Sequence, residues 1–178
     1  MKIDFSKLNI KDLANVICDI LLKNNIDVVL VGGACVSIYS KNKYMSYDLD
    51  FVTDKTLKEL ESVLNTIGFK RTGRLFKNDK CDYLIDFVSH PVMIGKEYTK
   101  DFEEMKTKYG LLKLLKPADC LKDRLAGYFY WNDPQSLEQA IMIYNKQKNK
   151  INLKEIENWS KKENNIEKYN IFIKKIIL

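Results

Sequence analysis

Val28-Val29-Leu30-Val31-Gly32-Gly33 is a short apolar run that stops at two glycines. Its length and its β-branched residues are typical of a buried strand. The residues that follow, 34–40, favour a short helix. Glycines beside a helix N-terminus let backbone N–H groups approach a phosphate closely. A Gly-Gly pair alone more often marks a tight turn, so the interpretation depends on what comes after it.

Acidic side chains come next, inside two predicted strands. Asp48 and Asp50 lie in a strand predicted over 48–52, where alternation puts both carboxylates on one face. A third acid, Asp86, lies in an apolar strand predicted over 83–88. If the sheet brings Asp86 within about 5 Å of the others, each like-charge pair costs on the order of 3 kcal/mol at an effective dielectric near 20.

The neighbouring sequence offers no arginine to compensate this charge, so the pattern predicts a divalent cation. Carboxylate oxygens suit Mg²⁺ or Mn²⁺, and Mg²⁺ usually shares its coordination sphere with substrate phosphates. Carboxylates, metal and a glycine-lined phosphate site together indicate phosphoryl or nucleotidyl transfer. Each feature alone has an ordinary structural explanation, and it is their order along the chain that favours the functional one. A Rossmann dinucleotide site is excluded because no G-x-G-x-x-G is present.

The remaining periodicity predicts an α/β (α+β) unit in residues 1–116 and a helical segment in residues 117–178. Within the first unit we expect helices over 10–23 and 57–67, a hairpin around Thr72-Gly73, and two short strands between 102 and 115. In the second, apolar side chains at helical spacing predict four helices, over 117–130, 134–146, 153–162 and 166–177.

Three segments carry a resemblance to a known family: VLVGGA (29–34), YDLDF (47–51) and LIDF (84–87). In this order they resemble the DNA polymerase β-type nucleotidyltransferase superfamily. The nearest branch is the small bacterial nucleotidyltransferases related to abortive-infection and toxin–antitoxin systems. The resemblance covers about residues 10–145.

This resemblance implies a mixed sheet with flanking helices, a nucleoside triphosphate (NTP) such as ATP as donor, and two Mg²⁺ (or Mn²⁺) ions. By the match, Gly32 and Gly33 hold the triphosphate. Asp48 and Asp50 ligate metal, and Asp86 both helps to bind one metal ion and activates the acceptor hydroxyl.

The same comparison implies a basic residue on a later helix that faces the active site, with Arg124 as the first candidate and Lys122 as the second. Ala34 is a departure, because a small polar residue that touches phosphate often follows the Gly-Gly pair. Ser37, one helical turn later, is the candidate replacement.

Two other classes of function stay open. The chain could be a catalytically inactive protein of the same fold that binds nucleotide or a partner protein. It could also bind RNA through residues 146–178, which hold nine lysines and four acids. For the enzyme, the acceptor stays open between RNA, protein and a small molecule, as does the oligomeric state.

The cysteines and the start of the sequence indicate where the protein is expected to act. The four cysteines form no C-x-x-C pair, and the chain begins without an export signal or a long apolar run. We therefore expect reduced thiols, a cytoplasmic location and no membrane segment. Tyr128, Tyr130 and Trp131 are interpreted as aromatic core at a helix end, with stacking on a base as the alternative.

Overall fold

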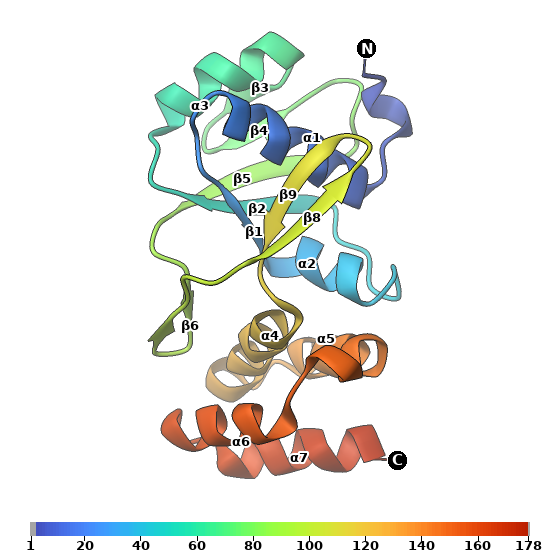
Figure 1. Cartoon of the computed structure of the whole chain (residues 1–178), viewed down its shortest axis with the longest axis vertical. Helices are drawn as coiled ribbons and strands as arrows, with labels where there is room; N and C mark the ends of the chain where they lie inside the picture. The colour runs from blue at the N-terminus through green and yellow to red at the C-terminus, as the bar shows by residue number, and fades with distance from the viewer. Residues whose placement is uncertain (1–2, 178) are drawn as a thin grey trace.

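The computed structural model describes residues 3–177, and it shows a mixed sheet flanked by helices with a helical layer at one end (Figure 1). The α/β fold predicted from the sequence is therefore confirmed. Seven strands form the main sheet in the order β3-β4-β5-β2-β1-β9-β8. Their bounds are β1 (Val29–Val31), β2 (Asp48–Thr53), β3 (Lys70–Thr72), β4 (Leu75–Lys77), β5 (Leu84–Ser89), β8 (Glu103–Thr107) and β9 (Gly110–Leu114).

The centre of the sheet combines both kinds of strand pairing. β2 is parallel to β5 and antiparallel to β1, and β1 is parallel to β9. The register places Asp50 opposite Asp86 on one side and opposite Val31 on the other. The end of β1, which leads into Gly32, therefore lies beside the acidic strand.

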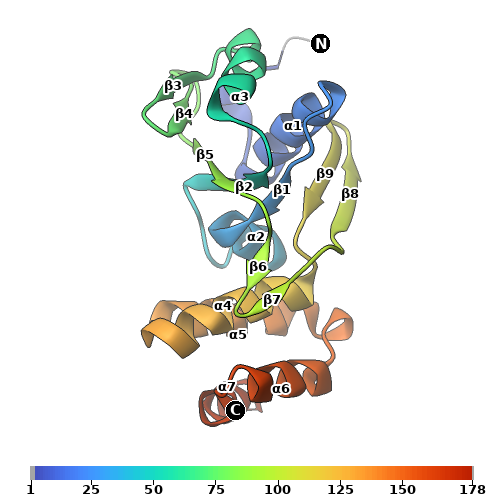
Figure 2. The same ribbon diagram turned by 90° about the vertical axis from the view of Figure 1, so that its left-hand side faces the viewer.

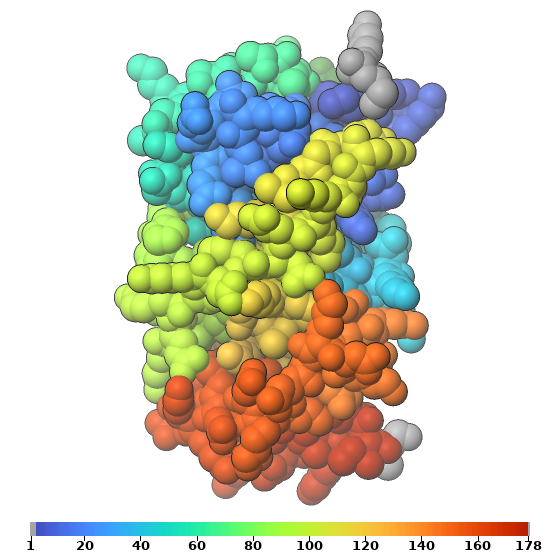
Figure 3. All heavy atoms as spheres, in the orientation of Figure 1, coloured from blue at the N-terminus to red at the C-terminus, as the bar shows by residue number. Residues whose placement is uncertain are grey.

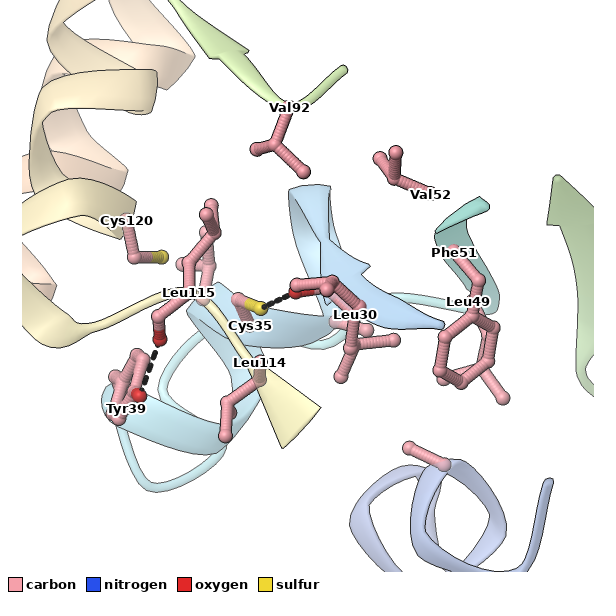
Figure 4. Packing of buried hydrophobic residues seen from close by; sticks show 14 of the residues in the cluster. Leu30, Cys35, Tyr39, Leu49, Phe51, Val52, Val92, Leu114, Leu115 and Cys120 are labelled. Carbon is pink, nitrogen blue, oxygen red and sulfur yellow. Dashed lines mark hydrogen bonds between the residues drawn. The ribbon is translucent and has the colours of Figure 1, made fainter. Parts of the chain in front are cut away.

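Helices cover the two faces of the sheet (Figures 1 and 2). α1 (Ile10–Lys23) and α3 (Leu57–Leu64) lie over one face, and α2 (Gly32–Tyr39) lies over the other. Leu49 and Phe51 are fully buried, and Figure 4 shows them above the α1 ribbon. Because side chains alternate along β2, its acids point to the opposite face, on the α2 side.

The helical layer follows β9 and lies beyond α2 (Figure 1). It consists of α4 (Pro117–Trp131), α5 (Pro134–Gln147), α6 (Leu153–Lys162) and α7 (Ile166–Ile177). The Tyr39 hydroxyl donates to Leu115 O at 2.6 Å, as Figure 4 shows. Gln147 Nε2 also donates to Tyr39 O, at 3.0 Å. The two layers form one continuous surface in Figure 3. The division after residue 116 stays a prediction.

Most of the helices and strands predicted from the sequence are confirmed within a few residues. Helix α1 begins after Asn9, whose side chain accepts from Asp12 N, and the hairpin of β3 and β4 turns at Gly73. Two differences matter. α2 begins at Gly32, so both glycines belong to its first turn. A small hairpin of β6 (Met93–Ile94) and β7 (Glu97–Tyr98) was not predicted, because two-residue strands are too short to show alternation.

Among the helices of residues 3–177, none combines the length and the apolar composition that a membrane crossing requires.

Candidate active site

The three predicted acids lie together at the centre of the sheet. Asp50 of β2 and Asp86 of β5 are direct partners across neighbouring parallel strands, which run about 4.8 Å apart. Asp48 lies two residues before Asp50 and shares its face. Asp86 is buried, Asp50 is partly buried and Asp48 is exposed. The strand register alone thus brings three carboxylates to one place.

Asp50 has the least compensated charge of the three. Ser46 donates to Asp48 and Arg74 donates to Asp86, whereas within residues 3–177 no hydrogen-bond donor reaches the Asp50 carboxylate. Burial raises the pKa of Asp50 to about 6, with further contributions from the negative charges of Asp48 and Asp86. Arg124 and Arg74 lower that pKa and offset only part of the rise. A partly buried carboxylate in this state favours a proton or a cation beside it.

Position 32 requires glycine because its backbone lies against the Asp50 carboxylate. Its φ is +68°, and a Cβ added there would lie 2.5 Å from Asp50 Oδ2. Any larger residue would therefore be strained and would push the carboxylate. A Cβ at Gly33 would lie 2.9 Å from Ser46 Oγ. The N-terminus of α2 has no side-chain cap at Val31, so its first N–H groups lie beside the acids without one.

Ser37 and Ser46 position Asp48. The Ser37 hydroxyl donates to Gly33 O at 3.3 Å and accepts from Ser46 N at 2.8 Å. Ser46 Oγ then donates to Asp48 Oδ1 at 2.5 Å. Ser37 is fully buried, so its hydroxyl holds the loop before β2 and is not presented to a ligand. This placement differs from the phosphate contact expected from the sequence.

Arg74 is a site residue that the sequence reasoning missed. From the turn between β3 and β4 it donates Nε to Asp86 Oδ1 at 3.0 Å and Nη2 to Asp86 Oδ2. The sequence was interpreted as offering no arginine to compensate the acids, and that interpretation is wrong. The available signal was rarity, because Arg74 is one of only three arginines among 30 basic residues.

The donor atoms suit Mg²⁺ or Mn²⁺, but they are not gathered as a finished metal site. No group of three His, Cys, Asp or Glu side chains within residues 3–177 is placed to hold an ion together. The hydrogen bonds explain why, since Arg74 engages both oxygens of Asp86 and Ser46 holds one oxygen of Asp48. Asp50 and Asp48 remain as hard oxygen donors on one strand, and the uncompensated charge of Asp50 fits a cation.

The two predicted basic residues of α4 lie in different places. Arg124 is close enough to Asp50 to lower its pKa, and it is held by Asp123 and by Gln139 Oε1 at 3.3 Å. Lys122 instead lies 3.6 Å from Asp119 and lines a small pocket beside Trp159. Arg124 is therefore near enough to Asp50 for its charge to act there, whereas Lys122 pairs within α4 and lines a different pocket.

A pocket of about 590 Å³ opens beside Arg124 on α4 and α5. Trp131 and Tyr130 line it with 82% and 42% of their surfaces exposed. Core packing was the expected role for these two aromatics, and the structure corrects that expectation. Asp123, Asp133, Ser136 and Gly127 complete a wall that is about equally polar and apolar.

Comparison with known proteins places this fold. No protein-family model matches the sequence, and no curated protein matches it. Among solved structures, an antigenic nucleotidyltransferase-like protein from Paracoccidioides brasiliensis superimposes with a TM-score of 0.55 at 15% identity, covering 75% of this chain and 73% of that one. A crystal structure of ANT(2")-Ia in complex with adenylyl-2"-tobramycin gives a TM-score of 0.53 at 11% identity, covering 93% and 97%. The chain thus has the fold of nucleotidyltransferases.

Proposed function

We propose that the protein is a divalent-metal-dependent nucleotidyltransferase that moves a nucleoside monophosphate from an NTP to an acceptor hydroxyl. The observation that carries the proposal is the register of β2 and β5. It sets Asp50 directly opposite Asp86, with Asp48 on the same face and Gly32 against Asp50. The nucleotidyltransferase fold and the acids expected from the sequence agree at this point.

Each residue has a role in this proposal. The backbone N–H groups of Gly32 and Gly33, at the N-terminus of α2, bind the phosphate chain of the donor. Asp48 and Asp50 hold Mg²⁺, which when bound neutralises phosphate charge and polarises the reacting phosphate. Asp86 would help to hold one metal ion, and it accepts the proton of the acceptor hydroxyl as that oxygen attacks the α-phosphorus of the donor and pyrophosphate leaves. Arg124 supplies positive charge from the helical layer.

A small polar molecule is the acceptor that the surface favours. The pocket beside Arg124 has room for one, and its exposed aromatics together with the polar side chains of Asp123, Asp133 and Ser136 suit a hydroxylated ligand. The ANT(2")-Ia structure, which shares the fold, holds an adenylylated small molecule. RNA is the less favoured acceptor, because three lysines of residues 146–178 already form ion pairs with glutamates. These pairs are Lys150 with Glu103, Lys161 with Glu157 and Lys162 with Glu97. A toxin–antitoxin association stays a prediction.

The test is transfer of label. The protein is incubated with Mg²⁺ and each α-³²P-labelled NTP, in the presence of separate RNA, protein and small-molecule fractions of a cell lysate. We expect one nucleotide to label the small-molecule fraction, and Asp50→Asn to abolish that labelling. Asp82→Asn is the matched control, because Asp82 is an exposed acid in the loop before β5.

Binding separates the enzyme from the inactive alternative. An NTP with Mg²⁺ at about 100 times its dissociation constant should stabilise the fold by about 2.7 kcal/mol. At this chain length that corresponds to about 5–10 °C in melting temperature. Stabilisation without transfer to any fraction would favour the inactive protein that binds nucleotide. If no NTP stabilises the protein and no fraction is labelled, the proposed function is wrong.

A further inference from the structure

Arg74, in the turn of the β3–β4 hairpin, forms an ion pair with Asp86 of the acid cluster. Within residues 3–177 it is the one ion pair to these three acids. The pair is two-pronged, with Nε and Nη2 on the two oxygens of Asp86. Phe87 N also donates to Asp86 Oδ1, at 2.8 Å. The Asp86 side chain is 12% exposed and that of Arg74 is 65% exposed. A mostly exposed guanidinium therefore holds a buried carboxylate that also accepts from a backbone N–H.

This pairing competes with the role proposed for Asp86. Each oxygen that accepts from the guanidinium has less capacity to accept a proton from an acceptor or to ligate a cation. A divalent cation beside Asp86 would also repel the positive charge of Arg74. The acids can do their proposed work only after Arg74 has left Asp86.

The hairpin gives Arg74 freedom to leave. The preceding residue, Gly73, has a φ of +64°, and a Cβ added there would meet nothing within 4 Å. Only the guanidinium of Arg74 is tied down, since its side chain is mostly in solvent. The triphosphate of a donor would offer it a new partner, because arginine binds phosphate oxygens in the same two-pronged way as carboxylate.

We propose that Arg74 is a positioning residue with two partners: it holds Asp86 when no cation is bound, and it moves to the phosphate chain of the donor when cation and donor bind. This inference rests on the proposed function. It assigns the β3–β4 hairpin a part in donor binding. It also means that, without metal, both oxygens of Asp86 are occupied by Arg74, and that binding of the Mg²⁺–NTP complex frees them.

The test compares Arg74→Gln and Arg74→Lys with the wild type in two binding measurements without turnover. Mn²⁺ binding alone is measured by electron paramagnetic resonance. Binding of α,β-methylene analogues of the four NTPs with Mg²⁺ is measured by calorimetry. Lys77→Gln is the matched control, because Lys77 is an exposed cation on β4 of the same hairpin and forms no ion pair within residues 3–177, whereas Arg71 donates to Gly73 O, the carbonyl next to Arg74.

Opposite signs are expected for the two ligands. Arg74→Gln should bind Mn²⁺ severalfold more tightly, because the competitor of Asp86 is gone. It should bind the Mg²⁺-loaded analogue about tenfold to a hundredfold more weakly, the usual loss for a hydrogen bond between charged groups. Arg74→Lys keeps the charge without the fork, so its affinity for the analogue should lie between the two. Lys77→Gln should match the wild type in both measurements.

Two results would overturn the inference. Unchanged affinity of Arg74→Gln for the analogue would mean that Arg74 never reaches the phosphates. Weaker Mn²⁺ binding in that variant would mean that Arg74 only supports the position of Asp86. If Arg74→Gln fails to fold by circular dichroism, Arg74→Lys decides by the same two measurements. A wild type that binds none of the four analogues contradicts the proposed function itself, which is a different outcome.

Discussion

Asp50 is the residue on which the site depends most, because its charge is the least compensated of the three acids. Asp50→Asn keeps the size of the side chain and removes that charge. We expect it to abolish transfer and yet to raise the melting temperature of the metal-free protein. A relief of the order of 1 kcal/mol corresponds to about 2–4 °C at this length. Asp82→Asn should change neither quantity, and a lower melting temperature for Asp50→Asn would contradict this account.

The pH dependence of stability follows from the same residue. The pKa of Asp50 is about 6 in the folded protein, against about 3.9 for an unperturbed aspartate. Between these values the folded state binds more protons than the unfolded one, so stability decreases as pH rises through this window. The advantage of Asp50→Asn over the wild type should therefore be largest above pH 7 and should shrink towards pH 4. Urea titrations of both proteins at pH 4.5, 6 and 7.5 measure it.

Two features require glycine at position 32, a positive φ and the lack of space for a Cβ. A matched pair of variants separates their effects. Gly32→Ala combines a strained backbone with a Cβ 2.5 Å from Asp50 Oδ2, whereas Gly73→Ala has a similar φ of +64° and open space. Both should lose about 1–3 kcal/mol to the backbone. Gly32→Ala alone should also lose Mn²⁺ binding, because it displaces the carboxylate. Equal Mn²⁺ affinity in the two variants would show that the close approach of Gly32 to Asp50 does not affect metal binding.

The sequence predicted the acids because alternation along a strand is a local rule that assigns each side chain to a face. It could not predict the pair of Arg74 with Asp86, which forms through the fold of a hairpin and not through local spacing. The choice between Lys122 and Arg124 needed the helix phase. Residues two apart on a helix point about 200° apart, so only one of them can face the acids.

At the scale of elements, the loop between α2 and β2 supports the first acid of the cluster. Ser37→Ala would leave the buried N–H of Ser46 without its acceptor, at a cost of about 1–3 kcal/mol. The loosened loop should then hold Asp48 less well, so Mn²⁺ affinity should fall together with stability. Ser62→Ala is the control, since the exposed Ser62 hydroxyl bonds only Glu59 O within its own helix. Lost stability with unchanged Mn²⁺ binding would confine Ser37 to a structural role.

Elements with their own end signals were predicted well. Asn9 caps α1, Thr56 and Glu59 form a capping box on α3, and Pro117 begins α4. The β6–β7 hairpin carries one local signal, the turn glycine Gly95 with a φ of +60°, between strands of only two residues. It is held from outside, where Lys96 N donates to Glu163 Oε1 at 3.0 Å and Lys162 pairs with Glu97. Structure that depends on a distant partner cannot be found in the local pattern.

The whole molecule places the site between its two layers. The sheet and α2 supply the acids and the glycines, and α4 supplies Arg124 together with one wall of the pocket. Tyr39 and Leu115 join the layers close to the start of α4 (Figure 4). The helical layer is therefore part of the candidate active site, which the sequence indicated through Arg124 and Lys122 and through the alternative role of the aromatics in α4.

The lysines of the helical layer test whether it also binds RNA. We consider the variant with Lys148, Lys150, Lys161 and Lys162 changed to Gln. Three of these lysines pair with glutamates on the surface, so we expect the variant to bind NTP analogues as the wild type does and to lose under about 1 kcal/mol of stability per pair.

Duplex RNA binding should show the same salt dependence in this variant as in the wild type, measured by fluorescence anisotropy between 50 and 200 mM salt, a range of about fourfold. Four lysine–phosphate contacts would instead give the wild type a log–log slope of about −3.6, because each contact releases counterions. A slope of that size that flattens in the variant would move the acceptor from a small molecule to RNA. The transfer chemistry at Asp48, Asp50 and Asp86 would be unaffected by that outcome, since none of the four lysines pairs with these acids within residues 3–177.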